Sequence, residues 1–330
     1  MCGIGGIYRA SEALLPVQAT LSLWEGLEGR GTDASGFALH WLDSDKPIVV
    51  KQPGATGLLQ NRLSNFMGDG STTRYVLLHT RFTTQGSTEN NANNHPVVRE
   101  GIVVTHNGVL YNDREVFKTL GVSPSADVDT EAINAALRHE SPGWTLDHID
   151  GSMSVAWVDE TADSDIVHLM TNGGNPLVIA RTTDNHIVWS STLDILEESE
   201  FDIKTYFHAC PFKVYSLHPD GAIRSEFVSE QREMANLGLW GHAASRRSYS
   251  ASTRSVGVKG RKSKKKAQKG RKGPKKPSNL PSGCIGVQPG PSILSQDAAD
   301  EWREYMSEAG YVEVWRAGQW VWVPASEVTL

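Results

Sequence analysis

The sequence predicts an α+β protein in which strands and helices form a layered sandwich. Two observations indicate this fold class. Residues 1–228 consist mainly of short apolar or β-branched runs, each bounded by Gly, Pro, Asn or Asp. Few helical patterns are interposed, and they do not alternate regularly with strands as in a doubly wound parallel sheet. The chain has 330 residues, of which 39% are hydrophobic, and this is enough apolar material for a large core.

Ten strands and two helices are expected in this part of the chain. One helix covers residues 130–139, where Ile133, Ala136 and Leu137 share a face and Asp129 is a candidate N-cap. A second helix covers residues 17–27. The strands are expected at residues 3–10, 36–42, 47–52, 75–81, 102–108, 152–160, 165–171, 175–181, 186–192 and 212–219.

The composition changes after residue 228, so we place a domain boundary near Ser229. Residues 229–296 are interpreted as the remnant of a helix followed by a disordered basic linker rich in Ser, Gly, Lys and Pro. Residues 297–330 are expected to form a short helix at 297–309 and a Trp-rich hairpin that turns at Ala317 and Gly318. So small an element has only marginal stability alone, which favours a role in docking to residues 1–228 or to a partner.

The formal net charge of −6 hides a strong asymmetry along the chain. Between Arg246 and Lys276 lie 14 of the 32 basic residues, and no Asp or Glu occurs from Met234 to Gln296. The segment from Lys259 to Lys276 could contact nucleic acid weakly through phosphates. The simpler interpretation is a solvated linker, because no aromatic residue is present between Val256 and Pro281 to stack on bases.

Several classes of protein are excluded by what the sequence lacks. No apolar run is long enough to span a membrane, and the first twenty residues do not resemble a secretory signal. Three cysteines are too few and too scattered for a disulfide framework, so a cytoplasmic protein with reduced thiols is expected. No metal or cofactor is expected either, since CxxC, HExxH, Walker A and GxGxxG patterns are absent.

The second residue is the main candidate for catalysis. Removal of the initiator Met1 would leave Cys2 at the N-terminus, with a thiol and a free α-amine in one residue. A terminal amine titrates near pH 7.7 to 8.0, so it can take the proton of the thiol at cellular pH. The alternative is that a cysteine at position 2 has no function.

Further segments make the N-terminal part resemble the class II glutamine amidotransferases, whose glutaminase domain is an N-terminal nucleophile hydrolase. The blocks similar to those of glucosamine-6-phosphate synthase cover about residues 2–220, in the same order and at similar spacing. They are MCGIGGI at Met1, RGTDASG at Arg30, HTRFTTQG at His79, NNHP at Asn93, HNG at His106, DVDTE at Asp127, NPLVIAR at Asn175 and WSSTLDIL at Trp189. The resemblance implies a four-layer αββα sandwich.

The resemblance also implies roles for individual residues. Cys2 would attack the side-chain amide of glutamine and form a γ-glutamyl thioester, and Asn107 and Gly108 would stabilise the oxyanion. Arg81 would bind the α-carboxylate of glutamine and Asp129 its α-ammonium, with Thr84 and Gly86 as further contacts. Structural support is expected from Arg30, Asp33, His79 and His106.

Taken one by one, these residues also have ordinary structural interpretations. Asn107 and Gly108 could form a type I′ turn after the strand at 102–108, and Asp129 could be a plain N-cap. Arg81 could be a surface arginine at the end of a strand. The chain also departs from the family pattern, because Phe82 and Gln85 replace a Trp and a His, and Thr32 replaces a Tyr. In the family that the chain resembles, the positions of Phe82 and Gln85 help to close the glutamine pocket or couple it to an acceptor site.

The expected function is therefore a glutaminase subunit that converts L-glutamine to glutamate and ammonia for a partner synthetase acting in trans. Small stand-alone versions resembling it are familiar in bacteriophage and bacterial gene sets. Two alternatives remain open. One is an N-terminal nucleophile amidase that cleaves another amide, and the other is an amidotransferase tethered to nucleic acid that modifies nucleotides or DNA. A hydrolase with Cys210 or Cys284 as nucleophile has no motif to support it.

Overall fold

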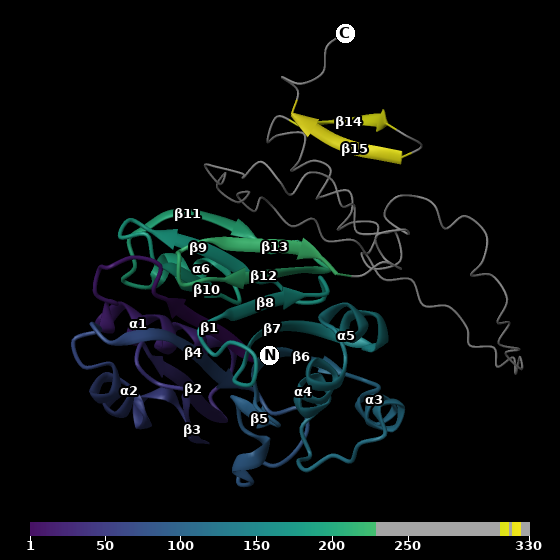
Figure 1. Cartoon of the computed structure of the whole chain (residues 1–330), viewed down its shortest axis with the longest axis horizontal. Coiled ribbons are helices and arrows are strands. Elements are labelled where there is room, and N and C mark those ends of the chain that lie inside the picture. The colour runs from purple at the N-terminus through teal and green to yellow at the C-terminus, as the bar shows by residue number, and fades with distance from the viewer. Residues whose placement is uncertain (229–310, 317–318, 325–330) are drawn as a thin grey trace, which may run out of the picture. The chain divides into compact units, whose positions relative to one another are not determined.

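The computed structural model describes residues 1–228, 311–316 and 319–324. The chain divides into two compact units, residues 1–233 and 234–330, and each is described by itself. The first unit contains two β-sheets in which every adjacent pair of strands is antiparallel. In Figure 1 helices α1 and α2 lie on one side of these sheets and α3, α4 and α5 on the other.

The first sheet has seven strands in the order β11-β9-β10-β1-β4-β2-β3. Its strands are β1 (Gly3–Tyr8), β2 (Ala34–Trp41), β3 (Ile48–Pro53), β4 (Thr73–Arg81), β9 (Val178–Thr182), β10 (Ile187–Ser190) and β11 (Ile203–His208). The second sheet has six strands in the order β13-β12-β8-β7-β6-β5. They are β5 (Val97–Arg99), β6 (Ile102–Leu110), β7 (Gly151–Asp159), β8 (Val167–Thr171), β12 (Lys213–Leu217) and β13 (Ile223–Phe227).

Helices cover the outer face of each sheet. Buried residues of α1 (Val17–Gly26), α2 (Gln60–Met67) and α6 (Leu193–Glu198) pack in one cluster with the seven-stranded sheet. Those of α3 (Asp113–Leu120), α4 (Thr130–His139) and α5 (Pro142–His148) pack in another with the six-stranded sheet. Short 3₁₀ helices cover Leu27–Arg30, Thr56–Leu58 and Asn91–Asn93. A third cluster joins the two sheets, which completes the predicted αββα sandwich.

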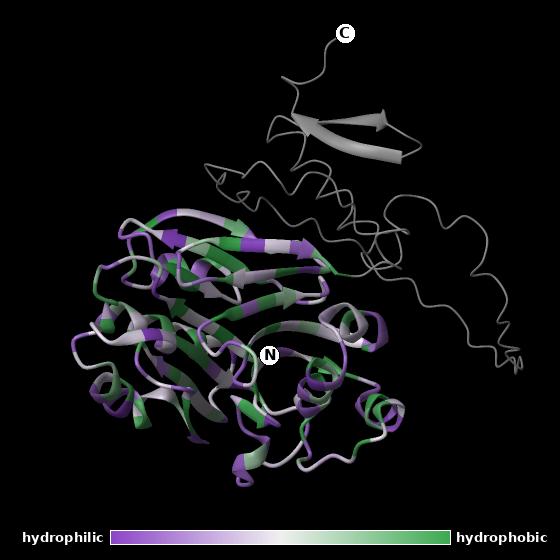
Figure 2. Ribbon diagram, viewed as in Figure 1, coloured by the Kyte–Doolittle hydropathy of each residue, from purple (hydrophilic) through white to green (hydrophobic). Residues whose placement is uncertain are grey.

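The alternation of side chains along the central strands explains why both faces of a sheet are buried. Ile4 and Tyr8 of β1 belong to the core between the sheets, whereas Ile7 faces the helices. Such strands carry long hydrophobic stretches, drawn in green in Figure 2. Gly6 is required here because a Cβ atom would lie 2.2 Å from the ring of the buried Trp189.

All ten predicted strands are present, and the two predicted helices correspond to α4 and α1. The sequence reasoning missed strands β5, β11 and β13 and helices α2, α3, α5 and α6. One local interpretation is wrong. Asn107 and Gly108 do not form a hairpin turn, because β6 continues through them to Leu110 and both residues pair with β7.

In the second unit the structure describes one antiparallel strand pair, β14 (Tyr311–Arg316) and β15 (Gln319–Pro324). Tyr311 pairs with Pro324 and Arg316 with Gln319, as in the predicted hairpin. The linker at 229–296, its basic segment from Lys259 to Lys276 and the helix predicted at 297–309 lie outside the described residues. No helix in the described part of the chain is long and apolar enough to cross a membrane.

Candidate active site

Three strands from the two sheets bring the predicted site residues together. In the antiparallel pairing of β1 with β4, Gly3 lies opposite Thr80, so Cys2 and Arg81 are neighbours where β1 begins and β4 ends. Strand β6 of the other sheet contacts both β1 and β4 and carries Asn107. The site therefore depends on the packing of one sheet against the other.

Cys2 is almost completely buried and is held from several sides. Its thiol lies 3.5 Å from the carbonyl oxygen of Phe82. The carbonyl of Cys2 accepts a hydrogen bond from Nε of Arg30 at 2.8 Å. The Asn107 amide is assigned the orientation that satisfies both of its neighbours: its nitrogen then donates to the carbonyl of Cys2 at 2.9 Å, and its oxygen accepts from the guanidinium of Arg30 at 3.2 Å. Arg30 and Asn107 thus fix the backbone of the candidate nucleophile.

The surroundings of Cys2 favour a neutral thiol. Burial raises the pKa of the Cys2 thiol above its ordinary value, and the carboxylate of Asp129 adds to this. The backbone of Phe82, the terminal ammonium group and Arg81 act in the opposite direction but do not reverse it. A neutral thiol needs a base to remove its proton before it attacks, which is the task assigned above to the α-amine.

Asn107 and Gly108 lie side by side in β6. One N–H of the Asn107 amide donates to Cys2, and the other has no partner among the described residues. No side chain fits at Gly108, because a Cβ atom would lie 1.9 Å from the carbonyl oxygen of Ser152. The backbone carbonyl of Asn107 accepts from the amide of the buried Asn175 at 3.1 Å, which anchors the strand at this point.

Arg81 is a buried side chain and not the surface arginine considered above. Its guanidinium donates to Oδ1 of Asn94 at 2.8 Å and to the carbonyl oxygens of Gln85 and Gly86, the latter at 3.0 Å. These bonds use one N–H of Nη1 and both of Nη2, so the Nε–H and the other Nη1–H have no partner among the described residues. Burial lowers the pKa of Arg81, while Cys2 and two nearby carboxylates raise it.

Asp129 precedes α4, but its side chain makes no capping hydrogen bond. Instead Oδ2 accepts from the backbone N–H of Leu110 at 2.8 Å, at the end of β6. The plain N-cap interpretation is therefore wrong, because this carboxylate is directed toward the sheet. Among the described residues, the one hydrogen-bonding group near Oδ1 is the hydroxyl of Thr130, at 3.4 Å.

Two buried histidines, His95 and His106, contact the hydroxyl of Thr130 and decide where its proton goes. A third, His79, donates from Nε2 to the backbone carbonyl of His106 at 3.0 Å. Nε2 of His106 lies 3.4 Å from the carbonyl of Ser152, so this nitrogen carries a hydrogen. Nδ1 of His106 must then accept from Thr130, at 2.9 Å. Thr130 in turn accepts from Nε2 of His95 at 2.8 Å, so its single proton is not available to Asp129.

Burial keeps these histidines uncharged. It lowers the pKa of His79 to about 3, and it also lowers those of His95 and His106. The rings of His79 and His95 stack with their centroids 4.0 Å apart, and the Nδ1 atom of each lacks a hydrogen-bond partner in the described structure. They are supporting groups beside the site, and they leave Oδ1 of Asp129 open to a cation.

The loop after β4 carries the other predicted contacts. Thr84 is exposed, and Gly86 has a φ of +72°, where a Cβ atom would also lie 2.8 Å from the amide of Asn93. Asp33 holds the start of this loop, since its Oδ2 accepts from the backbone N–H of Thr83 at 2.7 Å. In the described residues, no cluster of three His, Cys, Asp or Glu side chains could hold a metal ion.

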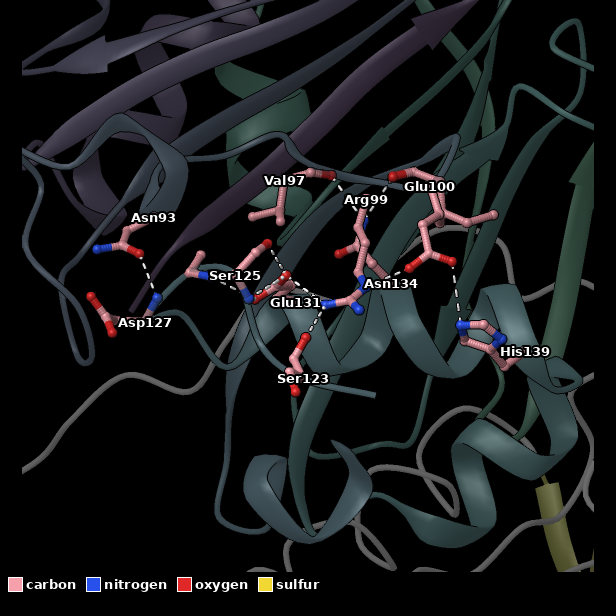
Figure 3. A network of polar contacts seen from close by, with 12 residues as sticks. Asn93, Val97, Arg99, Glu100, Ser123, Ser125, Asp127, Glu131, Asn134 and His139 are labelled. Atoms are coloured by element: carbon pink, nitrogen blue, oxygen red, sulfur yellow. Dashed lines mark hydrogen bonds and ion pairs between the residues drawn. The ribbon is translucent and has the colours of Figure 1, made fainter. Parts of the chain in front are cut away.

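A buried carboxylate holds the segment that precedes α4. Figure 3 shows Glu131 between Arg99 and the chain around Ser125. Glu131 accepts from Arg99 at 2.7 Å and from the backbone N–H groups of Ser125 and Ala126, at 2.9 and 2.8 Å for the shortest contacts. These bonds lower the pKa of Glu131 although burial opposes them. The backbone N–H of the next residue, Asp127, donates to Asn93 at 2.8 Å, which links this segment to the loop after β4.

Sequence reasoning missed several of the residues that hold the site. Asn94 and Asn175 lie in blocks that carried the family resemblance, so a signal for them was present. Lys51, which contacts the loop that contains Asn94, had no signal, because its partners are backbone carbonyls.

Known proteins resemble this chain in sequence and in fold. A family model described as "Glutamine amidotransferase domain" matches residues 79–198. The chain contains a class II glutamine amidotransferase domain. Among curated proteins, it is 31% identical over 215 residues to the glutamine–fructose-6-phosphate aminotransferase (isomerizing) of Francisella tularensis, covering 59% of this chain and 32% of that protein. The corresponding protein of Thermotoga maritima is 31% identical over 191 residues, covering 54% of this chain and 30% of that protein.

Solved structures give the same fold for the amidotransferase domain. The glutamine phosphoribosylpyrophosphate amidotransferase from B. subtilis superimposes with a TM-score of 0.54 and 22% identity, covering 69% of this chain and 50% of that one. A structure described as the allosteric regulatory enzyme of purine biosynthesis gives a TM-score of 0.55 at 20% identity, with 69% and 49% coverage. The chain spans about a third of the length of the curated relatives it matches.

Proposed function

We propose that the amidotransferase domain hydrolyses L-glutamine to glutamate and ammonia through a thioester on Cys2. The observation that carries this proposal is the arrangement around the buried thiol. Two donors, Arg30 and Asn107, fix the Cys2 backbone, and a guanidinium and a carboxylate act on the thiol from nearby. An amino acid carries both an α-carboxylate and an α-ammonium, so Arg81 and Asp129 together fit glutamine better than a simple amide.

The chemistry requires removal of Met1, whose side chain is exposed. The α-amine of Cys2 then takes the proton of the thiol while sulfur attacks the side-chain carbonyl carbon of glutamine. Asn107 and the N–H of Gly108 stabilise the negative charge on the carbonyl oxygen. When the tetrahedral intermediate collapses, the C–N bond breaks and the amine returns its proton to the leaving nitrogen, which departs as ammonia. Water next attacks the thioester, and glutamate is released with the thiol restored.

We also propose that the ammonia passes to an acceptor held by a partner synthetase. This finer proposal is supported by the curated relatives, which are named as glutamine–fructose-6-phosphate aminotransferases and of whose length this chain spans about a third. Copurification with a synthetase, and an amidation reaction that requires both proteins and glutamine, would support the coupling. Amidation by the synthetase that runs equally well without this protein in the presence of glutamine would count against it.

The first test is mass spectrometry after brief treatment with 6-diazo-5-oxo-L-norleucine, a diazoketone analogue of glutamine that alkylates reactive thiols. A chain that lacks Met1 and is modified only at Cys2 is the expected result. Glutamate release should disappear in Cys2→Ala and persist in Cys210→Ala. An unprocessed chain, or labelling at another cysteine, would contradict the proposal. Release of ammonia from asparagine or acylated amines, and not from glutamine, would instead support an amidase of different specificity.

A further inference from the structure

Lys51 is a half-buried cation for which the proposed reaction has no role. It lies on β3, and in the pairing of β2 with β3 it is opposite Gly36. Its ammonium donates to the carbonyl oxygens of Asn94 at 2.7 Å and Pro96 at 2.9 Å. No carboxylate lies within ion-pair distance of it among the described residues. An ammonium that is partly removed from water and lacks a counterion is destabilising, so the position of Lys51 calls for an explanation.

Asn94, whose backbone carbonyl accepts from Lys51, also orients Arg81 through its side chain. Oδ1 of this fully buried side chain accepts from Arg81 at 2.8 Å. Its amide nitrogen donates to the carbonyl of Thr88 at 2.7 Å and to Oδ1 of Asn91 at 3.0 Å. Every polar atom of the Asn94 side chain is thus committed. A shift of its backbone carbonyl, which Lys51 holds, would move the acceptor that orients the guanidinium of Arg81.

The loop that contains Asn94 is also packed tightly against β2, so it cannot shift in that direction. A Cβ atom at Gly36 would lie 2.1 Å from the carbonyl oxygen of His95, so the chain at Asn94–Pro96 lies directly on β2. Strand β3 also contacts this loop through the backbone, because the amide of Asn91 donates to the carbonyl of Lys51 at 2.8 Å. Lys51 therefore connects the sheet to the residue that orients Arg81.

We propose that Lys51 is a positioning residue for the α-carboxylate of the substrate, acting through Asn94 on Arg81 and adding a second positive charge behind the guanidinium. This inference rests on the proposed function, in which Arg81 binds that carboxylate. The ligand class is an α-amino acid with an uncompensated carboxylate. No carboxylate of the described residues forms an ion pair with Lys51 or Arg81, and the α-carboxylate of the substrate would then be their partner.

The titration of Lys51 gives the role a pH signature. Burial, and then the charge of Arg81, lowers the pKa of Lys51 to about 8. The other titratable groups that act on it, His79 and His95, are neutral. Because the pKa in the folded protein is below the ordinary value, the charge is present at pH 7 and is lost as the pH rises through 8. Substrate affinity should weaken over the same range.

The test compares two reagents that react with Cys2. 6-Diazo-5-oxo-L-norleucine has the α-carboxylate and α-ammonium of glutamine, whereas iodoacetamide has neither. In Lys51→Met at pH 7, the labelling rate at low concentrations of the diazoketone should fall about ten-fold, and the rate with iodoacetamide should stay within about two-fold. Lys51→Arg should keep the diazoketone rate and remove its decline between pH 7.5 and 9. Lys118→Met, at an exposed position on α3, is the matched control.

Each outcome bears on one proposal only. Equal diazoketone rates in the wild type and Lys51→Met would overturn the role of Lys51 and leave the glutaminase proposal standing. An equal fall in the rate of Cys2 labelling with both reagents would also overturn it, because the substitution would then have disturbed the structure in general. No diazoketone labelling of Cys2 in the wild type would instead contradict the proposed function. In steady-state hydrolysis, the expected change in Lys51→Met is about a ten-fold rise in KM with kcat within two-fold.

Discussion

Asn107 shows how one side chain can serve both the protein and the reaction. Its amide donates one N–H to the carbonyl of Cys2 and has a second N–H left. Asn107→Ala should lower kcat about 100- to 1,000-fold, the range found when one oxyanion donor is removed, with a much smaller change in KM. Steady-state glutamate release measures this. Asn107→Asp should be no better, because a carboxylate cannot donate and would face the Cys2 carbonyl.

The control for this prediction is Asn175→Ala, which removes the donor to the backbone of Asn107 and leaves its amide in place. A smaller loss of kcat is expected there. If Asn107→Ala kept kcat and raised only KM, the amide would be a substrate-binding group and not an oxyanion donor.

His79 should make the folded protein less stable as the pH falls below about 6.5. Its pKa is about 3 in the folded protein, so below the unfolded value near 6.5 the unfolded chain binds more protons and the fold is destabilised as the pH falls. Between pH 7 and pH 5 this histidine should cost about 2 kcal/mol of unfolding free energy. Urea denaturation of the wild type and His79→Gln at both pH values measures the difference.

The expected result is a smaller loss on acidification in His79→Gln than in the wild type. His139→Gln, at an exposed position of α4, should behave as the wild type does. Equal acid losses in all three proteins would mean that His79 is protonated without unfolding.

At the scale of elements, the close contact between β2 and the loop after β4 can be tested at Gly36. In Gly36→Ala the new methyl group would lie 2.1 Å from the carbonyl of His95 and 2.7 Å from the Lys51 side chain. We expect a loss of about 1 to 3 kcal/mol in unfolding free energy from this overpacking. The KM for glutamine should rise as well, because the same loop holds Arg81.

Gly57→Ala is the matched control, since nothing lies within 4 Å of a Cβ atom placed there. Thermal or urea unfolding and steady-state kinetics would be measured on both variants. A Gly36→Ala protein with wild-type stability and KM would show that the loop can move away from β2, against the rigid contact described above.

The elements that the sequence did not predict share a physical cause. Strands β5, β11 and β13 are at or beside sheet edges, and β13 has mostly exposed side chains, so they lack the apolar runs that indicate buried strands. Helix α2 has only Leu63 and Met67 buried, too few for a clear pattern. The start of α5 was readable, because Ser141 caps Trp144 at 3.1 Å and Pro142 follows it.

At the scale of the whole molecule, the site residues could be named from the sequence but their arrangement could not. Cys2, Arg81 and Asn107 came from motif blocks, which give order along the chain and not contacts between sheets. Lys51 was invisible, because a lysine that binds two backbone carbonyls has the same sequence context as an exposed one. The turn predicted at Asn107 was wrong, since pairing with β7 overrides the local preference of Asn-Gly.

The charge distribution leads to a final prediction about the full chain. The basic segment from Lys259 to Lys276 lies outside residues 1–228, which contain every proposed catalytic group. Deleting it should leave kcat and KM for glutamine within about two-fold of the wild type. If the segment contacts nucleic acid, the full chain should be retained on DNA at low salt and released as salt increases, with a steep dependence on concentration. The deleted protein should not be retained.

Retention that is unchanged by the deletion would remove the nucleic-acid interpretation of this segment, as would the absence of any retention of the full chain. The solvated-linker interpretation predicts that second result. A large loss of glutaminase activity on deletion would contradict the assignment of catalysis to residues 1–228. The two readouts therefore separate the chemistry at Cys2 from the role of the basic segment. Glutaminase kinetics depend on the packing of the two sheets, whereas retention on DNA depends on the eleven Lys and Arg side chains of the segment.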